Sequence, residues 1–141
     1  MEGWIAEAKA GGARVLAGGK RHGAAVEPTV IADAKPAMKV VCDEVFGPVV
    51  SLLLNDDVDE VFRIVSAGRC GLQTGIFTAS MALAIRAVRS LRTGGVILNG
   101  SSTWRTDQLA YGGVKDSGIG REGPRYSIRD MTEERVVLFN Y

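Results

Sequence analysis

The stretch Val49-Val50-Ser51-Leu52-Leu53-Leu54 decides the fold, because this nearly unbroken apolar run is followed by alternating helix and strand signals. Such a run is typical of a strand covered on both faces, as in a parallel sheet. Asp57 can cap a following helix, with Glu60 three residues on as in a capping box, and Gly68 suits its end. The predicted buried stripe of this helix has helical spacing: Val58, Val61, Phe62 and Val65.

A second helix and two more strands follow. Gly75-Ile76-Phe77-Thr78 and Val96-Ile97-Leu98-Asn99 are predicted strands. Ser80 can cap the helix between them, and Gly94-Gly95 can end it. Its predicted inward face comprises Met81, Ala84, Ile85, Val88 and Leu91. The order β-α-β-α-β requires parallel strands joined by right-handed crossovers, so the sequence predicts an α/β fold with a parallel core.

The flanking segments are shorter. A helix is predicted at residues 2–10, and short strands are predicted at residues 14–17 and 28–31. Residues 100–123 form a long glycine-rich loop, and a loop of that length in a compact domain is often functional. The chain is then predicted to run into a short helix and to close with an apolar strand, residues 135–139. Such a strand must pair within the fold or on another subunit.

Bulk properties exclude several classes of protein. The 141 residues suit one domain, with 46% hydrophobic and 23% charged residues and a net charge of +1. The near-neutral charge argues against a nucleic-acid partner, which needs a clustered basic excess. No segment approaches the roughly 18 apolar residues of a membrane span. Two cysteines without metal-type spacing predict neither a disulfide framework nor a metal site, and they favour a cytoplasmic location.

The stretch Glu44-Val45-Phe46-Gly47-Pro48-Val49 places a carboxylate and an aromatic ring just before the apolar strand. The acid can hold two ribose hydroxyls, and the ring can cover a flat base. An exposed acid beside a core aromatic is the alternative. In the long loop, Trp104, Arg105 and Tyr111 can form a substrate-pocket wall, with Arg105 pairing with an anionic group, or they can be surface packing.

Two apparent motifs are interpreted as structural. Residues 118–123 match GxGxxG, but no strand runs into them, so a tight turn is a better interpretation than a phosphate cradle. Cys42 lies near Glu44, but the only histidine, His22, has no evident link to either cysteine. Small apolar packing is predicted for Cys42 and Cys70, and no catalytic nucleophile is predicted in this chain.

Read together, these segments resemble the C-terminal portion of the aldehyde dehydrogenase superfamily, from about residue 2 to the last strand. The resemblance rests on ordered motifs: Pro28-Thr29-Val30, residues 44–49, 71–78 and 94–99, and Tyr111-Gly112-Gly113-Val114-Lys115-Asp116-Ser117-Gly118-Ile119-Gly120-Arg121-Glu122. It implies that residues 1–131 are part of the catalytic domain and residues 132–141 an oligomerisation strand. It also implies a small-molecule aldehyde as substrate and assembly into a homo-oligomer.

The resemblance implies NAD- or NADP-dependent oxidation of an aldehyde to a carboxylic acid. In that family a cysteine thiolate attacks the aldehyde, hydride passes to the nicotinamide, and water releases the acid. Glu44 would bind the nicotinamide ribose hydroxyls and Phe46 would pack beside the nicotinamide. Tyr111 stands where the family usually has a phenylalanine near the active site. Trp104 and Arg105 lie in the variable substrate loop.

The family's dinucleotide-binding domain, catalytic cysteine and general-base glutamate belong to sequence upstream of this chain. The isolated chain is therefore predicted to be inactive. Two other hypotheses stay open. One is a non-catalytic assembly module, or a truncated gene product, that pairs through residues 135–141. The other is a small nucleotide-binding domain that uses residues 118–123.

Overall fold

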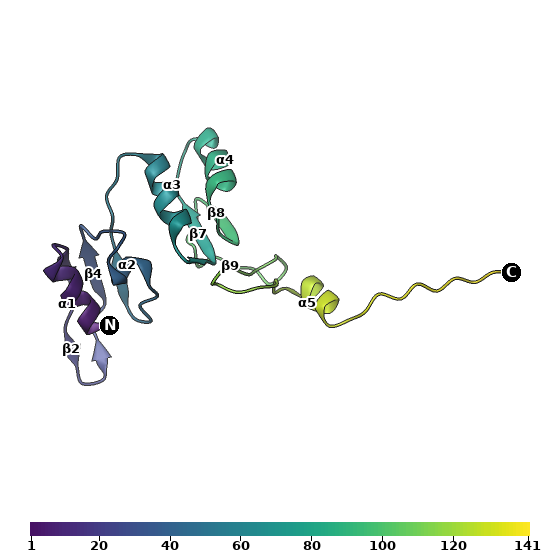
Figure 1. The fold of residues 1–141 in the computed structure, drawn as a ribbon, viewed down its shortest axis with the longest axis horizontal. Helices are drawn as coiled ribbons and strands as arrows, with labels where there is room; N and C mark the ends of the chain where they lie inside the picture. Colours follow the sequence, from purple (N-terminus) through teal and green to yellow (C-terminus); the bar gives the residue numbers. More distant parts are fainter. The chain divides into compact units, whose positions relative to one another are not determined.

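The computed structural model describes residues 1–141, which form two compact units, residues 1–64 and 65–141 (Figure 1). The first unit contains α1 (Glu2–Ala10), β1 (Arg14–Ala17), β2 (Arg21–His22), β3 (Ala25–Val26), β4 (Thr29–Ala32), α2 (Lys39–Cys42), β5 (Val49–Ser51) and most of α3 (Val58–Ala67). The second contains the end of α3, β6 (Cys70–Gly71), β7 (Gln73–Ile76), α4 (Met81–Ser90), β8 (Gly95–Leu98), β9 (Val114–Lys115) and α5 (Pro124–Asp130).

The first unit is built around a three-stranded sheet in the order β1-β4-β5. β1 is antiparallel to β4, and β4 is parallel to β5. Ile31 of β4 is completely buried at the centre of the core, which α1 covers with Ile5 and Ala8. The predicted helix at residues 2–10 and the strand at residues 14–17 are confirmed. The small β2–β3 hairpin was not predicted.

The second unit has a parallel pair, β7 and β8, and an antiparallel pair, β6 and β9. The predicted α/β class with parallel strands is thus confirmed. The antiparallel β6–β9 pair was not predicted, and β5 pairs with β4 and not with the two later strands. The physical reason is that β4 is buried, with Ile31 at the core centre, and offers a full partner edge.

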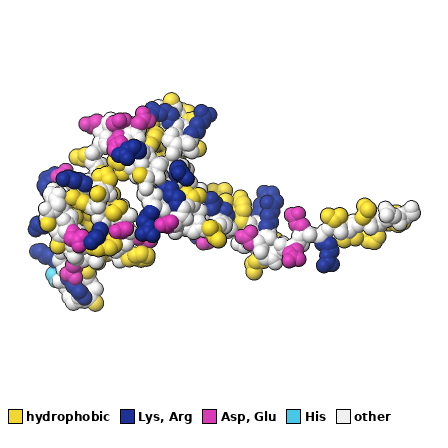
Figure 2. All heavy atoms as spheres, in the orientation of Figure 1, with side chains coloured by type: hydrophobic (Ala, Val, Ile, Leu, Met, Phe, Trp, Pro, Cys, Tyr) yellow, Lys and Arg dark blue, Asp and Glu magenta, His cyan; other side chains and the backbone are white.

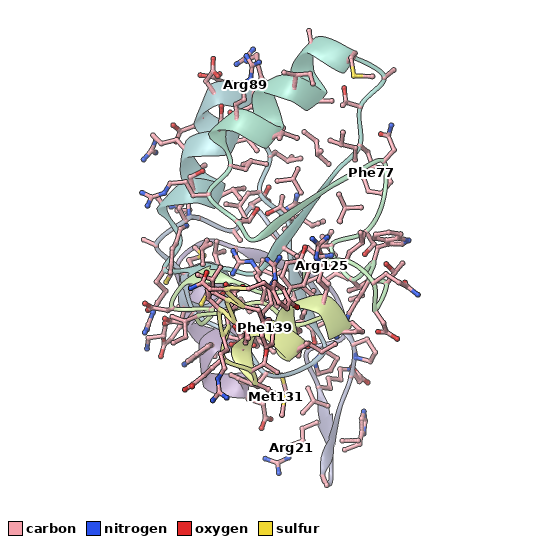
Figure 3. The ribbon with its side chains drawn as sticks, turned by 90° about the vertical axis from the view of Figure 1, so that its right-hand side faces the viewer. Arg21, Phe77, Arg89, Arg125, Met131 and Phe139 are labelled. Carbon is pink, nitrogen blue, oxygen red and sulfur yellow. The ribbon has the colours of Figure 1, made fainter.

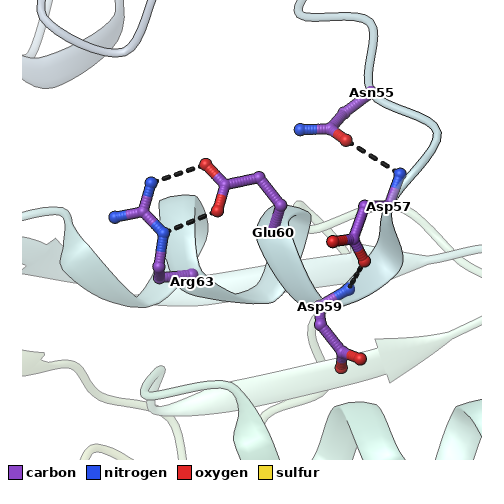
Figure 4. A network of polar contacts seen from close by, with 5 residues as sticks. All are labelled: Asn55, Asp57, Asp59, Glu60 and Arg63. Atoms are coloured by element: carbon purple, nitrogen blue, oxygen red, sulfur yellow. Dashed lines mark hydrogen bonds and ion pairs between the residues drawn. The ribbon is translucent and has the colours of Figure 1, made fainter.

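The start of α3 is held by a chain of short polar contacts (Figure 4). Asp57 Oδ1 accepts a hydrogen bond of 2.9 Å from Asp59 N, which confirms the predicted cap. The predicted capping box does not form, because Asp57 N donates to Asn55 Oδ1 at 2.8 Å. Glu60 instead accepts two hydrogen bonds from Arg63, at 2.6 and 2.5 Å.

Helix α4 buries only part of the predicted face, because Ala84 and Leu91 are buried as predicted but the other three predicted residues are exposed. Ser80 caps it as predicted, accepting a hydrogen bond of 3.2 Å from Leu83 N. The buried positions are Ala84, Ala87 and Leu91, whereas Met81, Ile85 and Val88 are exposed. In α3, Phe62 is buried, but Val58 and Val61 are exposed. The buried face of α4 includes Ala87, which was not predicted, and the small side chains of Ala84 and Ala87 allow close packing there.

Residues 132–141 follow α5 without forming a helix or strand. Their apolar side chains are exposed, as the yellow spheres along this segment show in Figure 2; they include Phe139, labelled in Figure 3. The predicted terminal strand is therefore not paired within this chain. No helix of the structure has the length and apolar character needed to cross a membrane.

Candidate functional site

The acid–aromatic turn, residues 43–47, is positioned by the core of the first unit. It leaves the end of α2 in extended conformation, and Val45 packs against the buried core. Glu44 and Phe46 stand on either side of Val45 in the chain. Both are exposed. Ser51 Oγ donates a hydrogen bond of 2.9 Å to Val40 O. This bond holds α2, which precedes the turn, against β5, which follows it.

Phe46 combines an unusual backbone conformation with an exposed side chain. Its φ is +41°, in the left-handed region that bulky residues rarely adopt, and its side chain is 86% exposed. The Gly47-Pro48 turn that follows is fixed, because Thr29 N donates a hydrogen bond of 2.7 Å to Pro48 O. The alternative that Phe46 is a core aromatic is therefore wrong. Strained residues of this kind cluster at ligand-binding sites.

The turn has the chemistry that a ribose and a flat base require. No group of this chain hydrogen-bonds to the Glu44 carboxylate, so both of its oxygens can accept from hydroxyl groups. The Phe46 ring offers an uncovered aromatic face next to it. The residues present thus fit the nicotinamide–ribose half of a dinucleotide. This stays a prediction for both side chains.

A second cluster combines residues from the loop before β9 with one from the segment after it. The Arg105 guanidinium carbon sits 4.3 Å from the centre of the Tyr111 ring. Arg105 Nη2 donates 3.0 Å to Glu122 Oε2. The backbones of Tyr111 and Glu122 exchange two hydrogen bonds, of 3.1 and 2.6 Å. Arg105, Tyr111 and Glu122 therefore form a closed group, to which the sequence interpretation assigned only the first two.

Trp104 is tied to the same unit through its backbone. Gln73 Nε2 of β7 donates 2.5 Å to Trp104 O, which fixes the residue before Arg105. The Trp104 side chain is exposed. All three predicted pocket residues lie in the loop between β8 and β9, and Arg105 and Tyr111 are in contact, while the Trp104 side chain makes no hydrogen bond or ring contact with them. Glu122 was missed, although the Arg121-Glu122 pair at the end of the longest motif was a usable signal.

The segment 111–123 binds mostly to its own unit. Lys115 Nζ donates 2.8 Å to Ser66 O and 2.8 Å to Gly68 O, at the end of α3. Ser117 Oγ accepts 2.9 Å from Gly71 N. Arg121 Nη1 donates to two nearby carbonyls, those of Gly113 and Gly120. These contacts make the motif a brace between β6, β9 and the end of α3.

The GxGxxG segment is a turn, as predicted. Gly118, Gly120 and Gly123 have φ values of +114°, +78° and +124°. The helix that follows, α5, has only seven residues. A shallow depression of about 250 Å³ lies beside the segment, lined by Gly120, Arg121, Tyr126, Arg129 and Asp130.

Comparison with known proteins agrees with this arrangement. The sequence matches the Aldehyde dehydrogenase family over residues 1–137. The chain belongs to the aldehyde dehydrogenase family. The predicted resemblance is thus confirmed.

Among curated aldehyde dehydrogenases, a 3-sulfolactaldehyde dehydrogenase of Priestia megaterium is 45% identical over 140 residues, 99% of this chain and 29% of that protein. Among solved structures, aldehyde dehydrogenase 21 from Physcomitrella patens, in complex with the reaction product succinate, has a TM-score of 0.89 at 45% identity, covering 94% of this chain and 27% of the other. The glyceraldehyde-3-phosphate dehydrogenase of Methanocaldococcus jannaschii, complexed with NADP, has a TM-score of 0.86 at 33% identity, covering 92% and 28%. The chain thus spans less than a third of these proteins' length.

The two cysteines do not have the predicted apolar environment. Both Cys42 and Cys70 are free and exposed, so the prediction of small apolar packing is wrong. The physical reason for Cys42 is that α2 is a single short turn whose buried residue is Val40. No set of three or more His, Cys, Asp or Glu side chains is arranged to hold a metal ion.

Proposed function

We propose that this chain is the C-terminal part of a cytoplasmic, NAD- or NADP-dependent aldehyde dehydrogenase that oxidises a small aldehyde to a carboxylic acid. The observation that carries the proposal is the outward, unpartnered pair Glu44 and Phe46 on a fixed turn. The Glu44 carboxylate would accept hydrogen bonds from the nicotinamide ribose hydroxyls, and the Phe46 ring would limit the movement of the nicotinamide. When bound, the dinucleotide accepts the hydride.

The nucleophile would come from polypeptide outside this chain. In the proposed reaction a cysteine thiolate adds to the aldehyde to form a thiohemiacetal, which becomes a thioester when it gives up hydride to the dinucleotide. Water then hydrolyses the thioester, which releases the carboxylic acid and regenerates the cysteine thiol. Cys42 and Cys70 are free, and the only histidine, His22, pairs with Glu27 and so is not available as a base to activate either thiol. We therefore expect the isolated chain to be inactive with any aldehyde and either cofactor.

The substrate pocket would include Trp104, Arg105 and Tyr111. Arg105 would pair with an anionic group of the aldehyde, because a guanidinium binds carboxylate or sulfonate groups strongly. The named substrate of the Priestia relative carries a sulfonate, and the product bound to the Physcomitrella enzyme is a dicarboxylate. These relatives support an anionic aldehyde as the substrate class.

The test is Glu44→Gln in the complete enzyme. Loss of the carboxylate should slow single-turnover formation of the reduced cofactor by about 10- to 100-fold, because misplaced reactants react slowly. Asp43→Asn changes the adjacent carboxylate, which has no predicted role in cofactor binding, and is the matched control. Unchanged single-turnover and steady-state rates in Glu44→Gln would contradict the assignment.

The exposed terminal segment favours a second function, in subunit assembly. An apolar segment with unpaired backbone groups is suited to pair with a strand of another chain. We propose that residues 132–141 pair in this way in a homo-oligomer. Light scattering on the complete enzyme and on a variant that ends at residue 131 should show the smaller assembly for the truncated protein. Equal masses would contradict this role.

A further inference from the structure

We propose that Glu122 is a positioning residue that sets the specificity of the substrate pocket by holding Arg105 against Tyr111. The inference deepens the proposed function and rests on it. It concerns a residue that contacts Arg105 and has no predicted contact with substrate or cofactor.

The first argument is geometric. Arg105 is held from two sides, by the Tyr111 ring at 4.3 Å and by the Glu122 carboxylate at 3.0 Å. The guanidinium can therefore keep its plane against the ring, as a stacked cation does. The two partners are themselves locked together by the paired backbone hydrogen bonds between Tyr111 and Glu122. A movement of Arg105 away from the ring would break the hydrogen bond to Glu122.

The second argument is the number of donors left over. A guanidinium has five N–H groups, and Glu122 accepts only one of them. Asp107 Oδ1 lies 4.0 Å from Arg105 Nε, too far for a hydrogen bond. The side chain of Arg105 is 41% exposed. An anionic group can therefore still bind the free edge of the guanidinium in a two-point geometry.

The third argument concerns the cost of ordering. An unrestrained arginine must lose its rotamer freedom when it binds an anion, and this loss weakens binding. Arg105 is ordered before the substrate arrives, because Glu122 holds its tip and the contact between Gln73 and the Trp104 carbonyl holds its backbone. Removing Glu122 would thus leave the charge of Arg105 in place but make its binding of an anion weaker.

The test compares an anionic with a neutral aldehyde in the complete enzyme. The probes are 4-oxobutanoate and butanal, which have the same carbon chain. In Glu122→Ala, the ratio of the KM for 4-oxobutanoate to the KM for butanal should rise at least about fivefold, as expected for a lost hydrogen bond to a charged group. Glu122→Asp should restore part of the discrimination, and Glu122→Gln, which keeps an acceptor oxygen, should lie between alanine and wild type.

Asp107→Asn is the matched control. The Asp107 side chain is 89% exposed. The substitution removes one negative charge near Arg105 without removing a hydrogen bond. The KM ratio should therefore stay at the wild-type value. In the double variant Arg105→Gln with Glu122→Ala, the ratio should equal that of Arg105→Gln alone, because Glu122 acts through Arg105.

The outcomes separate the two proposals. A loss of discrimination in Arg105→Gln, with wild-type discrimination in all folded Glu122 variants, would overturn the role of Glu122 and leave the substrate class. A lower KM for 4-oxobutanoate in Glu122→Gln would also overturn it, because the carboxylate would then compete with the substrate for Arg105. Wild-type discrimination in Arg105→Gln, or an inactive complete enzyme, would remove both the proposed pocket and the inference.

Discussion

The acid–aromatic turn at residues 43–47 and the segment 111–123 use their side chains in opposite ways. In the turn, Glu44 and Phe46 point outward and contact no partner within the chain, while Val45 anchors them to the core. In the segment, Lys115 and Ser117 bind backbone groups of their own unit. The short motif thus leaves an acid and an aromatic ring exposed, and the longer motif mainly braces the fold.

A motif that is highly specific for the family therefore need not be the one that binds a ligand. The segment 111–123 contains the most specific match to the family, yet most of its side chains and glycines satisfy internal contacts. Tyr111 and Glu122 differ in that their side chains contact Arg105. If the comparison is right, substitutions in the brace should change stability, and substitutions in the turn should change cofactor binding.

The largest effect is expected at Gly94. A Cβ at this position would overlap the carbonyl oxygen of Gly112, a backbone atom that cannot rotate away. Gly94→Ala should therefore lower the free energy of unfolding by about 3 kcal/mol, at the upper end of overpacking effects. Urea unfolding followed by circular dichroism measures it.

Gly3→Ala is the control for the glycine prediction. Nothing lies within 4 Å of a Cβ at Gly3, which is in α1. Alanine should raise stability there by roughly 0.5–1 kcal/mol through helix propensity. Equal unfolding curves for Gly94→Ala and wild type would show that the 94–112 contact is not a brace.

The next effect is expected at Lys115. Lys115→Met removes the ammonium that satisfies the Ser66 and Gly68 carbonyls at the end of α3, and it keeps most of the apolar stem. The free energy of unfolding should fall by about 2 kcal/mol. Lys35→Met, at an exposed position outside the brace, is the matched control. A fall of the same size in both variants would mean that the loss comes from charge and not from these carbonyls.

Much of this fold could be predicted from sequence because local signals and tertiary packing agree. Apolar runs and the Asp57 and Ser80 caps define elements that the structure contains. The partner of β5 could not be predicted, because strand pairing depends on contacts distant in sequence. The Glu122 contact was missed for the same reason, since it lies 17 residues from Arg105.

At the turn, the comparison predicts a smaller effect on stability and one of the opposite sign. Phe46→Asn places a residue that tolerates the left-handed region at φ +41° and removes an exposed ring. The free energy of unfolding should rise by about 0.5–1 kcal/mol, while the Kd for the cofactor in the complete enzyme, measured by fluorescence titration, should rise. A less stable protein with unchanged affinity for the cofactor would mean that Phe46 stabilises the fold and does not bind the cofactor.

The smallest effect is expected at an exposed ion pair outside both regions, which provides a baseline. The hydrogen bonds from Arg63 to Glu60 lower the pKa of the Glu60 carboxyl. Because the folded pKa lies below the unfolded value, the pair stabilises the fold above the unfolded pKa, and this contribution is lost as the pH falls through the folded pKa. An NMR titration should therefore show Glu60 with a lower midpoint in wild type than in Arg63→Gln. Equal midpoints would mean that the ion pair does not persist in solution. The pair could then not serve as a baseline for the contribution of the Lys115 hydrogen bonds to stability.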